Sequence, residues 1–270
     1  MLGEIMLGQY FPGNSFVHGL DPRTKLIGTF IYIVAIFLAK TPLVYGILAA
    51  FGVLVVLLSR LPIMMVVRSL KPVWLIVAIT FVIHAFTYPG TEILWQWKFM
   101  SITKEGLALG TKMAFRLTLL LLFSSVLTFT TSPIVLTDGI EKLLRPLKCI
   151  GVPAHEIAMM MTIALRFIPT LLEETDRIMK AQEARGADFG KGNLVKRIKN
   201  TLPLLVPLFV SAFRRADELA TAMEARCYRG GEGRTRMYEL AYRKEDYLTF
   251  IFMIVFLVVI AGMSFLMRNA

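Results

Sequence analysis

Long apolar runs, separated by short basic or turn-forming segments, dominate the first half of the chain and return at its end. A transmembrane helix needs about twenty consecutive, mainly apolar residues. Runs that approach or reach this length occupy the segments 26–39, 43–58, 72–88, 107–129 and 247–267. The break at Lys40-Thr41-Pro42 predicts that the first two runs form a tight helical hairpin. Residues 89–106 are expected to form a loop outside the membrane, with an aromatic belt of tryptophan and tyrosine.

Between 132 and 245 the pattern changes from continuous runs to apolar positions spaced three and four apart, with charged residues between them. This spacing is typical of amphipathic helices. It predicts a short helix at 133–148 and two long helices, one at 154–186 and one that starts after 193 and ends near 227. Proline residues inside both long helices are expected to bend them.

The two patterns together predict the fold class. We expect an all-α polytopic membrane protein with about five transmembrane helices and three cytoplasmic or interfacial helices. The chain is expected to divide into an N-terminal lead with the first four spans (1–131), a cytoplasmic helical domain (132–245) and the last span (246–270).

Composition and charge support a membrane protein and give its orientation. Of the 270 residues, 56% are hydrophobic, the mean hydropathy is +0.64 and the formal net charge is +11. Such a charge could indicate nucleic-acid binding, but the basic residues fall mainly between apolar runs, as in the cytoplasmic loops of membrane proteins. The basic groups at 23–25 and 60–71 place the N-terminus and the end of the second span on the cytoplasmic side. Cys149 and Cys227 are then cytosolic and expected to be reduced.

Candidate catalytic and ion-coupling residues are scattered. The stretch 186–191 is one residue too short for a phosphate-binding loop, and His155-Glu156 lacks the second histidine of a zinc-binding helix. No Asp or Glu falls within the five predicted spans, so a carboxylate relay for proton or sodium coupling has no obvious residues. His84 is a functional candidate by its place in a span, although it lies near the outer end, where water can satisfy it. These observations disfavour a membrane enzyme and leave a self-contained secondary carrier or channel as the alternative to a transport component powered by other subunits.

One short pattern occurs twice. Residues 181–186 are Ala-Gln-Glu-Ala-Arg-Gly and residues 222–227 are Ala-Met-Glu-Ala-Arg-Cys. At the same offset, the following residues also match: Asp176 with Asp217, Gly190 with Gly231, and Gly192 with Gly233. Each copy is predicted to end a long helix, with Gly186 in the position of a left-handed cap. We call Ala184-Arg185-Gly186 the first tip and Ala225-Arg226-Cys227 the second tip. Two equivalent helix ends, each with an arginine, suit two equivalent pockets on a dimeric partner.

Four stretches of the sequence carry a specific family resemblance. They are Leu20-Asp21-Pro22-Arg23-Thr24-Lys25-Leu26, Ala-Leu-Arg-Phe-Ile-Pro-Thr-Leu at 164–171, the first tip with the following Ala187-Asp188-Phe189, and the second tip. On these residues the chain resembles, over essentially its whole length, the transmembrane (T) component of energy-coupling factor (ECF) transporters, the vitamin-uptake class of ABC transporters. The segment 232–236 resembles the type in which one T component serves several exchangeable substrate-binding subunits.

The resemblance implies a role and a set of partners. In this family the two tips end crossed coupling helices, and each tip docks on one of two cytosolic ATPase subunits that bind ATP. Carried over, the docking residues would be Ala184, Arg185, Gly186, Ala225, Arg226 and Cys227, although the family's second motif often ends in glycine rather than cysteine. A membrane-embedded substrate-binding S component would contact the apolar parts of the coupling helices. The resemblance implies no catalytic residue, cofactor or metal in this chain, and a location in a prokaryotic cell membrane.

Overall fold

The computed structural model describes residues 10–89, 92–97, 100–187, 194–231 and 240–269. The chain separates into two compact units, one made of Gly8–Gly139 with Leu240–Ala270 and the other including Ile140–Glu239. The first contains the predicted spans and is called the transmembrane unit; the second is called the helical unit. The expected division at 131/132 and 245/246 concerned the side of the membrane and stays a prediction.

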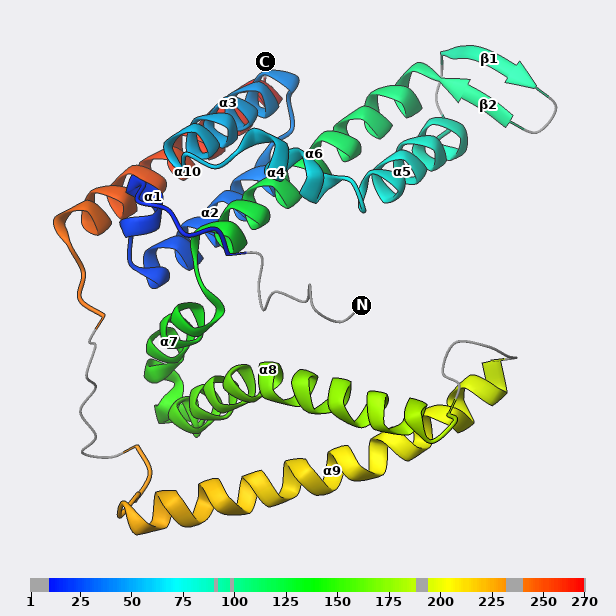
Figure 1. Cartoon of the computed structure of the whole chain (residues 1–270). Coiled ribbons are helices and arrows are strands. Elements are labelled where there is room, and N and C mark those ends of the chain that lie inside the picture. Colours follow the sequence, from blue (N-terminus) through cyan, green and yellow to red (C-terminus); the bar gives the residue numbers. More distant parts are fainter. Residues whose placement is uncertain (1–9, 90–91, 98–99, 188–193, 232–239, 270) are drawn as a thin grey trace. The chain divides into compact units, whose positions relative to one another are not determined.

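The transmembrane unit is built from helices at each of the five apolar runs (Figure 1). Its elements are α1 (Phe16–Gly19), α2 (Pro22–Leu38), α3 (Pro42–Leu58), α4 (Ile63–Leu70), α5 (Trp74–Thr87), β1 (Ile93–Trp97), β2 (Met100–Thr103), α6 (Lys104–Thr130), most of α7 (Pro133–Leu144) and α10 (Lys244–Asn269). The helical starts follow from local chemistry: Asp21 caps α2, whose first residue is proline, and Thr103 caps α6. The predicted all-α membrane fold is confirmed, with one addition at 93–103.

That addition is a small antiparallel hairpin of β1 and β2, in the segment expected to be a loop. Its register shifts between Ile93 and Trp95. The run at 93–97 is rich in residues that favour strands, but a two-stranded hairpin is too short to show a clear alternating pattern. This is why the sequence did not predict it.

The helices differ in how well they suit a membrane crossing. By length and composition, α6, α10 and the later helix α8 (Ala154–Ala184) can each span a bilayer, and the α4–α5 pair, bent by 53°, can act as a fourth span. The helix α8 was expected on the cytoplasmic side, so composition alone does not distinguish it from a span. The hairpin helices α2 and α3 have 17 residues each, or about 25 Å at 1.5 Å per residue, slightly less than the hydrocarbon core.

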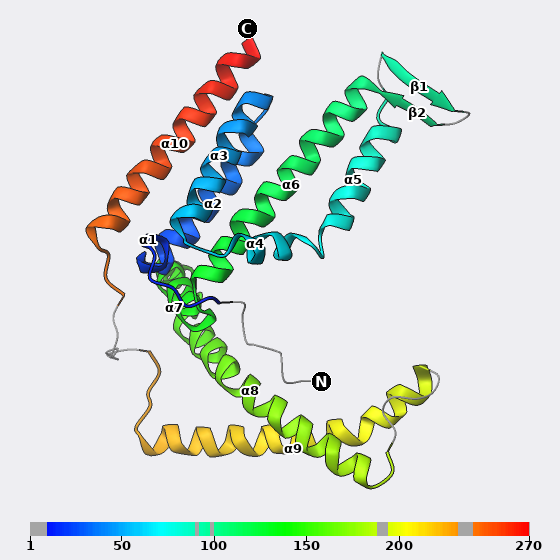
Figure 2. The same ribbon diagram turned by 45° about the horizontal axis from the view of Figure 1, so that its top comes forward.

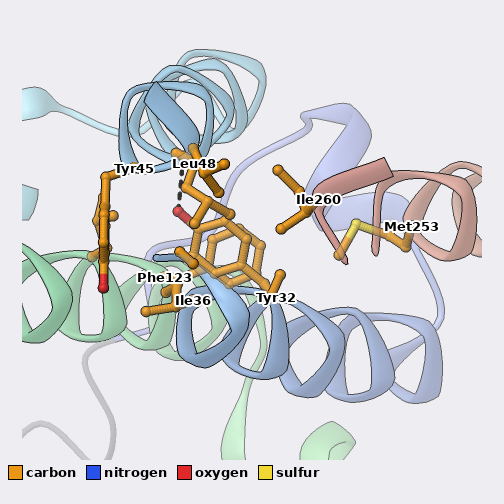
Figure 3. Packing of buried hydrophobic residues seen from close by; sticks show 11 residues of the cluster. Tyr32, Ile36, Tyr45, Leu48, Phe123, Met253 and Ile260 are labelled. Atoms are coloured by element: carbon orange, nitrogen blue, oxygen red, sulfur yellow. Dashed lines mark hydrogen bonds between the residues drawn. The ribbon is translucent and has the colours of Figure 1, made fainter. Parts of the chain in front are cut away.

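The core of the transmembrane unit lies where α2, α3, α6 and α10 meet (Figure 3). The ring of Tyr32 on α2 stacks on Phe123 of α6 with 4.0 Å between centroids. Its hydroxyl donates a 2.9 Å hydrogen bond to the carbonyl of Leu48 on α3, which satisfies a polar group that would be costly in an apolar core. From α10, Met253 and Ile260 complete the cluster. These contacts fix the hairpin against the last span.

A polar cluster fastens the start of α2 to the start of α10. We call it the clasp, and it consists of Asp21, Arg23, Tyr242 and Asp246. Arg23 pairs with Asp21 through two hydrogen bonds, of 3.0 Å from Nε and 2.9 Å from Nη2, and its guanidinium lies 3.8 Å above the ring of Tyr242. The same Nη2 donates to the carbonyl of Leu240 at 3.2 Å. The Asp-Pro-Arg stretch thus holds the segment that leads into α10.

The carboxylate of Asp246 completes the clasp and is 1% exposed. Its two oxygens accept hydrogen bonds of 2.8 Å from the backbone N–H groups of Asp21 and Arg243. Burial would raise the pKa of Asp21, but hydrogen bonds from Arg23 and the charges of Arg23 and Lys25 outweigh it and lower that pKa. Asp21 therefore stays ionised at neutral pH, as its pairing requires.

The same turn also touches the chain where it leaves the transmembrane unit. A Cβ on Gly139 would lie 3.0 Å from Cβ of Pro22, which is tighter than most carbon contacts allow. Gly139 is the last residue of the unit before the helical unit, and Leu240 is the first after it. Both connections to the helical unit are thus held by residues 21–23.

The helical unit consists of the end of α7, a 3-10 turn at Arg145–Ile150, and the long helices α8 (Ala154–Ala184) and α9 (Leu194–Ala225). These bounds agree with the predicted helices. The helices α8 and α9 run in opposite directions and contact each other (Figure 2). Glu174 on α8 and Arg215 on α9 form an ion pair of 3.9 Å. The predicted prolines lie inside them.

Candidate functional site: two arginine tips

The first tip is a helix end closed by a left-handed residue. Gly186 has φ of +88°, a conformation that glycine adopts without steric cost. The N–H of Ala187 donates to the carbonyl of Gln182 at 3.0 Å, and that of Gly186 donates to Glu183 at 2.9 Å. This pair of bonds is the Schellman motif. The predicted left-handed cap is confirmed, and Arg185 occupies the C-cap position just before it.

The second tip has the same geometry although its last residue is not glycine. Cys227 has φ of +56°. The N–H of Tyr228 donates to the carbonyl of Met223 at 3.0 Å, and that of Cys227 donates to Glu224 at 2.8 Å. Each bond matches its counterpart in the first tip at the repeat offset. The repeat in sequence is therefore also a repeat in backbone structure.

Both tips present their arginines to solvent. Arg185 and Arg226 are exposed, as are the neighbouring alanines and Cys227. Within the part of the chain that the structure describes, neither arginine makes an ion pair. Because α8 and α9 are antiparallel, their tips lie at opposite ends of the helix pair (Figures 1 and 2). Each guanidinium is thus free to bind a carboxylate or carbonyl group on another protein.

The caps of the two tips should respond in opposite ways to matched substitutions. Gly186→Ala forces a Cβ into the left-handed region and should destabilise the end of α8 by about 1 kcal/mol, whereas Cys227→Gly relieves that strain and should stabilise the end of α9 by a similar amount. Hydrogen exchange at the last turn of each helix measures both effects. Equal exchange rates in each variant and wild type would contradict the assigned cap geometry.

The segment after the second tip returns to the start of α8. A Cβ on Gly231 would lie only 2.5 Å from Cδ2 of His155, so this position requires glycine. The imidazole ring of His155 is held in place on its other side, where its Nδ1 lies 3.1 Å from the carboxylate of Glu141. In the sequence, His155 drew attention only as a candidate zinc ligand, and no group of three metal-binding side chains occurs among the residues that the structure describes. In the structure, His155 packs against Gly231 and pairs with Glu141.

The middle of α9 exposes a large apolar surface. Val206, Phe209, Val210 and Phe213 are each between 61% and 69% exposed. A surface of this kind marks an interaction site in a protein or a membrane. It lies on the same helix as the second tip, so one element carries both an exposed arginine and an exposed apolar surface.

His84, the candidate in the third span, is satisfied locally. Its Nδ1 lies 2.8 Å from the carbonyl of Thr80, one turn earlier in α5. The carbonyls of His84 and Ala85 approach Gly106 of α6 so closely that a Cβ there would meet them at 3.0 and 3.1 Å. The histidine therefore belongs to a tight helix pair. Cys149 and Cys227 are free and exposed.

The architecture and the tips define a class of protein: an all-α membrane protein with two long helices, each of which ends in a tip with an exposed arginine. Comparison with known proteins identifies the family. Residues 13–237 match the CbiQ family, described as cobalt transport protein. The chain is 66% identical over 97% of both chains to the energy-coupling factor transporter transmembrane protein EcfT of Acidaminococcus fermentans. It is 48% identical to the EcfT of Bacillus subtilis, over 99% of this chain and all of that one. The chain therefore belongs to the CbiQ family, within the transmembrane (T) components of ECF transporters, which are non-enzymatic membrane proteins.

Proposed function

We propose that the chain is the coupling scaffold of an ECF transporter for vitamins. The first tip docks on one cytosolic ATPase subunit and the second tip on another. ATP is bound and hydrolysed by those subunits, and this chain supplies no catalytic residue or cofactor. The observation that carries the proposal is the repeated Schellman end, which presents Arg185 and Arg226 in the same local geometry. Two equal contacts suit a dimer of ATPases better than a single asymmetric partner.

The apolar surface of α9 is the proposed contact for the substrate-binding S component. Movement of the ATPases shifts the tips, and the helices α8 and α9 pass this movement to the S component, which reorients in the membrane. Because that contact is mostly apolar, it can accept several exchangeable S components. The N-terminus and the helical unit are cytoplasmic in this proposal, as the basic segments indicate.

Reconstitution in liposomes tests the proposal against the alternative of a self-contained carrier or channel. The purified chain alone should give no substrate flux. Flux should appear only when the ATPases and an S component are added and ATP is supplied on the side of the membrane that carries the ATPases. Flux from the chain alone, down a gradient of substrate or ions, would establish the alternative instead.

A further inference from the structure

An apolar cavity of about 620 Å³ lies in the transmembrane unit, outside the tips and the α9 surface. Its walls come from α1, α2, α3, α6 and α10. This volume falls within the range of about 300–1,000 Å³ typical of small-molecule sites. The lining is almost wholly hydrocarbon, with Phe51, Phe123 and Phe252 among its larger side chains. A hydrocarbon chain suits it better than a polar solute.

The rim of the cavity faces away from the helix bundle. Leu54 and Leu58 on α3, and Leu248 and Ile251 on α10, line it and are each between 47% and 69% exposed. On a unit that spans a membrane, such side chains face lipid. The cavity is therefore open to acyl chains of the bilayer.

One cation, Lys25, lines the cavity at the start of α2. Its Nζ donates hydrogen bonds to the carbonyls of His18 at 3.1 Å and Thr130 at 3.0 Å. An ammonium group has three donors, so one more acceptor can bind. Among the residues that the structure describes, no carboxylate lies within ion-pair distance of this ammonium, and no acidic side chain lines the cavity. Asp21 and Asp246 act on this ammonium from outside the lining, so the charge that the cavity lining itself presents to a ligand is positive.

We propose that this cavity binds one acyl chain of an anionic phospholipid, whose phosphate accepts a hydrogen bond from Lys25. The apolar lining takes the chain, and the ammonium at the end of the cavity takes the headgroup. Lys25 precedes the first apolar run, which places it at the level of headgroups. This inference is independent of the proposed docking of ATPases.

Two substitutions separate the contributions of the cavity and the charge. Gly28 on α2 lines the cavity, and a Cβ there would have its nearest neighbour, Met253 Cε, at 3.8 Å. Gly28→Leu therefore fills the cavity, and Gly46→Leu on α3 is the matched control, because its site is open and outside the lining. Lys25→Gln removes the charge, and Lys40→Gln, at an exposed position, is its control.

The test is native mass spectrometry of the full chain, released from nanodiscs with equal amounts of phosphatidylglycerol and phosphatidylcholine. Wild type should retain one phosphatidylglycerol with about tenfold preference, because phosphatidylcholine has the same phosphate but adds a cationic choline, which the ammonium of Lys25 repels. Lys25→Gln should abolish the preference, Gly28→Leu should remove the retained lipid, and both controls should behave as wild type. Equal retention of the two lipids by wild type, or unchanged retention in Gly28→Leu, would overturn the proposal.

A second measurement identifies the occupant in the assembled transporter. A photo-crosslinking amino acid at Leu54 should label phospholipid in membranes. Labelling of another protein subunit instead would show that the cavity is a protein interface and would also overturn the proposal. This readout does not depend on whether Lys25→Gln or Gly28→Leu folds.

Discussion

The double variant Arg185→Glu with Arg226→Glu is expected to lose stable association with the ATPase subunits. Removing one partner of a buried charged pair at an interface costs about 2–5 kcal/mol, and reversing its sign adds repulsion. With both tips changed, no intact contact remains to hold the dimer. Co-purification of tagged ATPases with the chain measures the effect. The chain itself should still fold, because both arginines are exposed and contribute little to its core.

A matched control is available on the same two helices. Arg177 on α8 and Arg214 on α9 are also exposed, and Arg177→Glu with Arg214→Glu changes the net charge by the same amount. This control should retain ATPase binding, since neither residue lies at a helix end. Binding by the tip variant equal to that by the control would refute docking through the tips.

Single variants should show intermediate binding. When one tip is intact, the ATPase dimer is still held by one contact, and the second contact is favoured by the high local concentration of its partner. Arg185→Glu and Arg226→Glu should therefore each weaken association less than the double variant. Because both tips share the same cap geometry, the two single effects should be similar in size.

The helices and the tips were largely predictable from the sequence, because both depend on local patterns of residues. Continuous apolar runs give α3, α6 and α10, and the three-four spacing gives α8 and α9. Gly186 after an amphipathic run predicts its own left-handed conformation, because few other residues adopt it at low cost. The repeat indicated that 227 corresponds to 186, but a cysteine does not by itself predict a positive φ. Only the structure shows that the two caps are alike.

The long-range contacts were not predictable. Leu20–Leu26 carried the family resemblance, but its partners Tyr242 and Asp246 lie more than 200 residues away, and no local pattern connects them. The same holds for Gly231 and His155, and for the cavity, whose lining comes from five separate helices. Local periodicity specifies which face of a helix is apolar, while the choice of its neighbour depends on packing of the whole unit.

The clasp supplies the second large effect. Asp246→Ala should lower the stability of the transmembrane unit by about 2–4 kcal/mol, because the buried N–H of Asp21 and the partly buried N–H of Arg243 lose their acceptor. The midpoint of thermal unfolding of the chain in detergent should fall by about 5–10 °C. The control is Glu245→Ala, the adjacent acidic residue, which is exposed and should change the midpoint little.

Proteolysis shows whether that loss is local. Tyr242 and Leu240 are held by Arg23, and Arg23 is held by Asp21, so without Asp246 the segment before α10 should open more often. Trypsin should then cleave faster after Arg243 in Asp246→Ala than in Glu245→Ala, while cleavage after Arg177 stays the same.

Lowering the pH is an independent way to weaken the clasp. The pKa of Asp21 lies below its ordinary value of 3.8, so its contribution is complete above that value and is lost as the pH falls through the lowered pKa. If cleavage and unfolding are the same in Asp246→Ala and Glu245→Ala, then residues 21–23 do not anchor the segment that leads into α10.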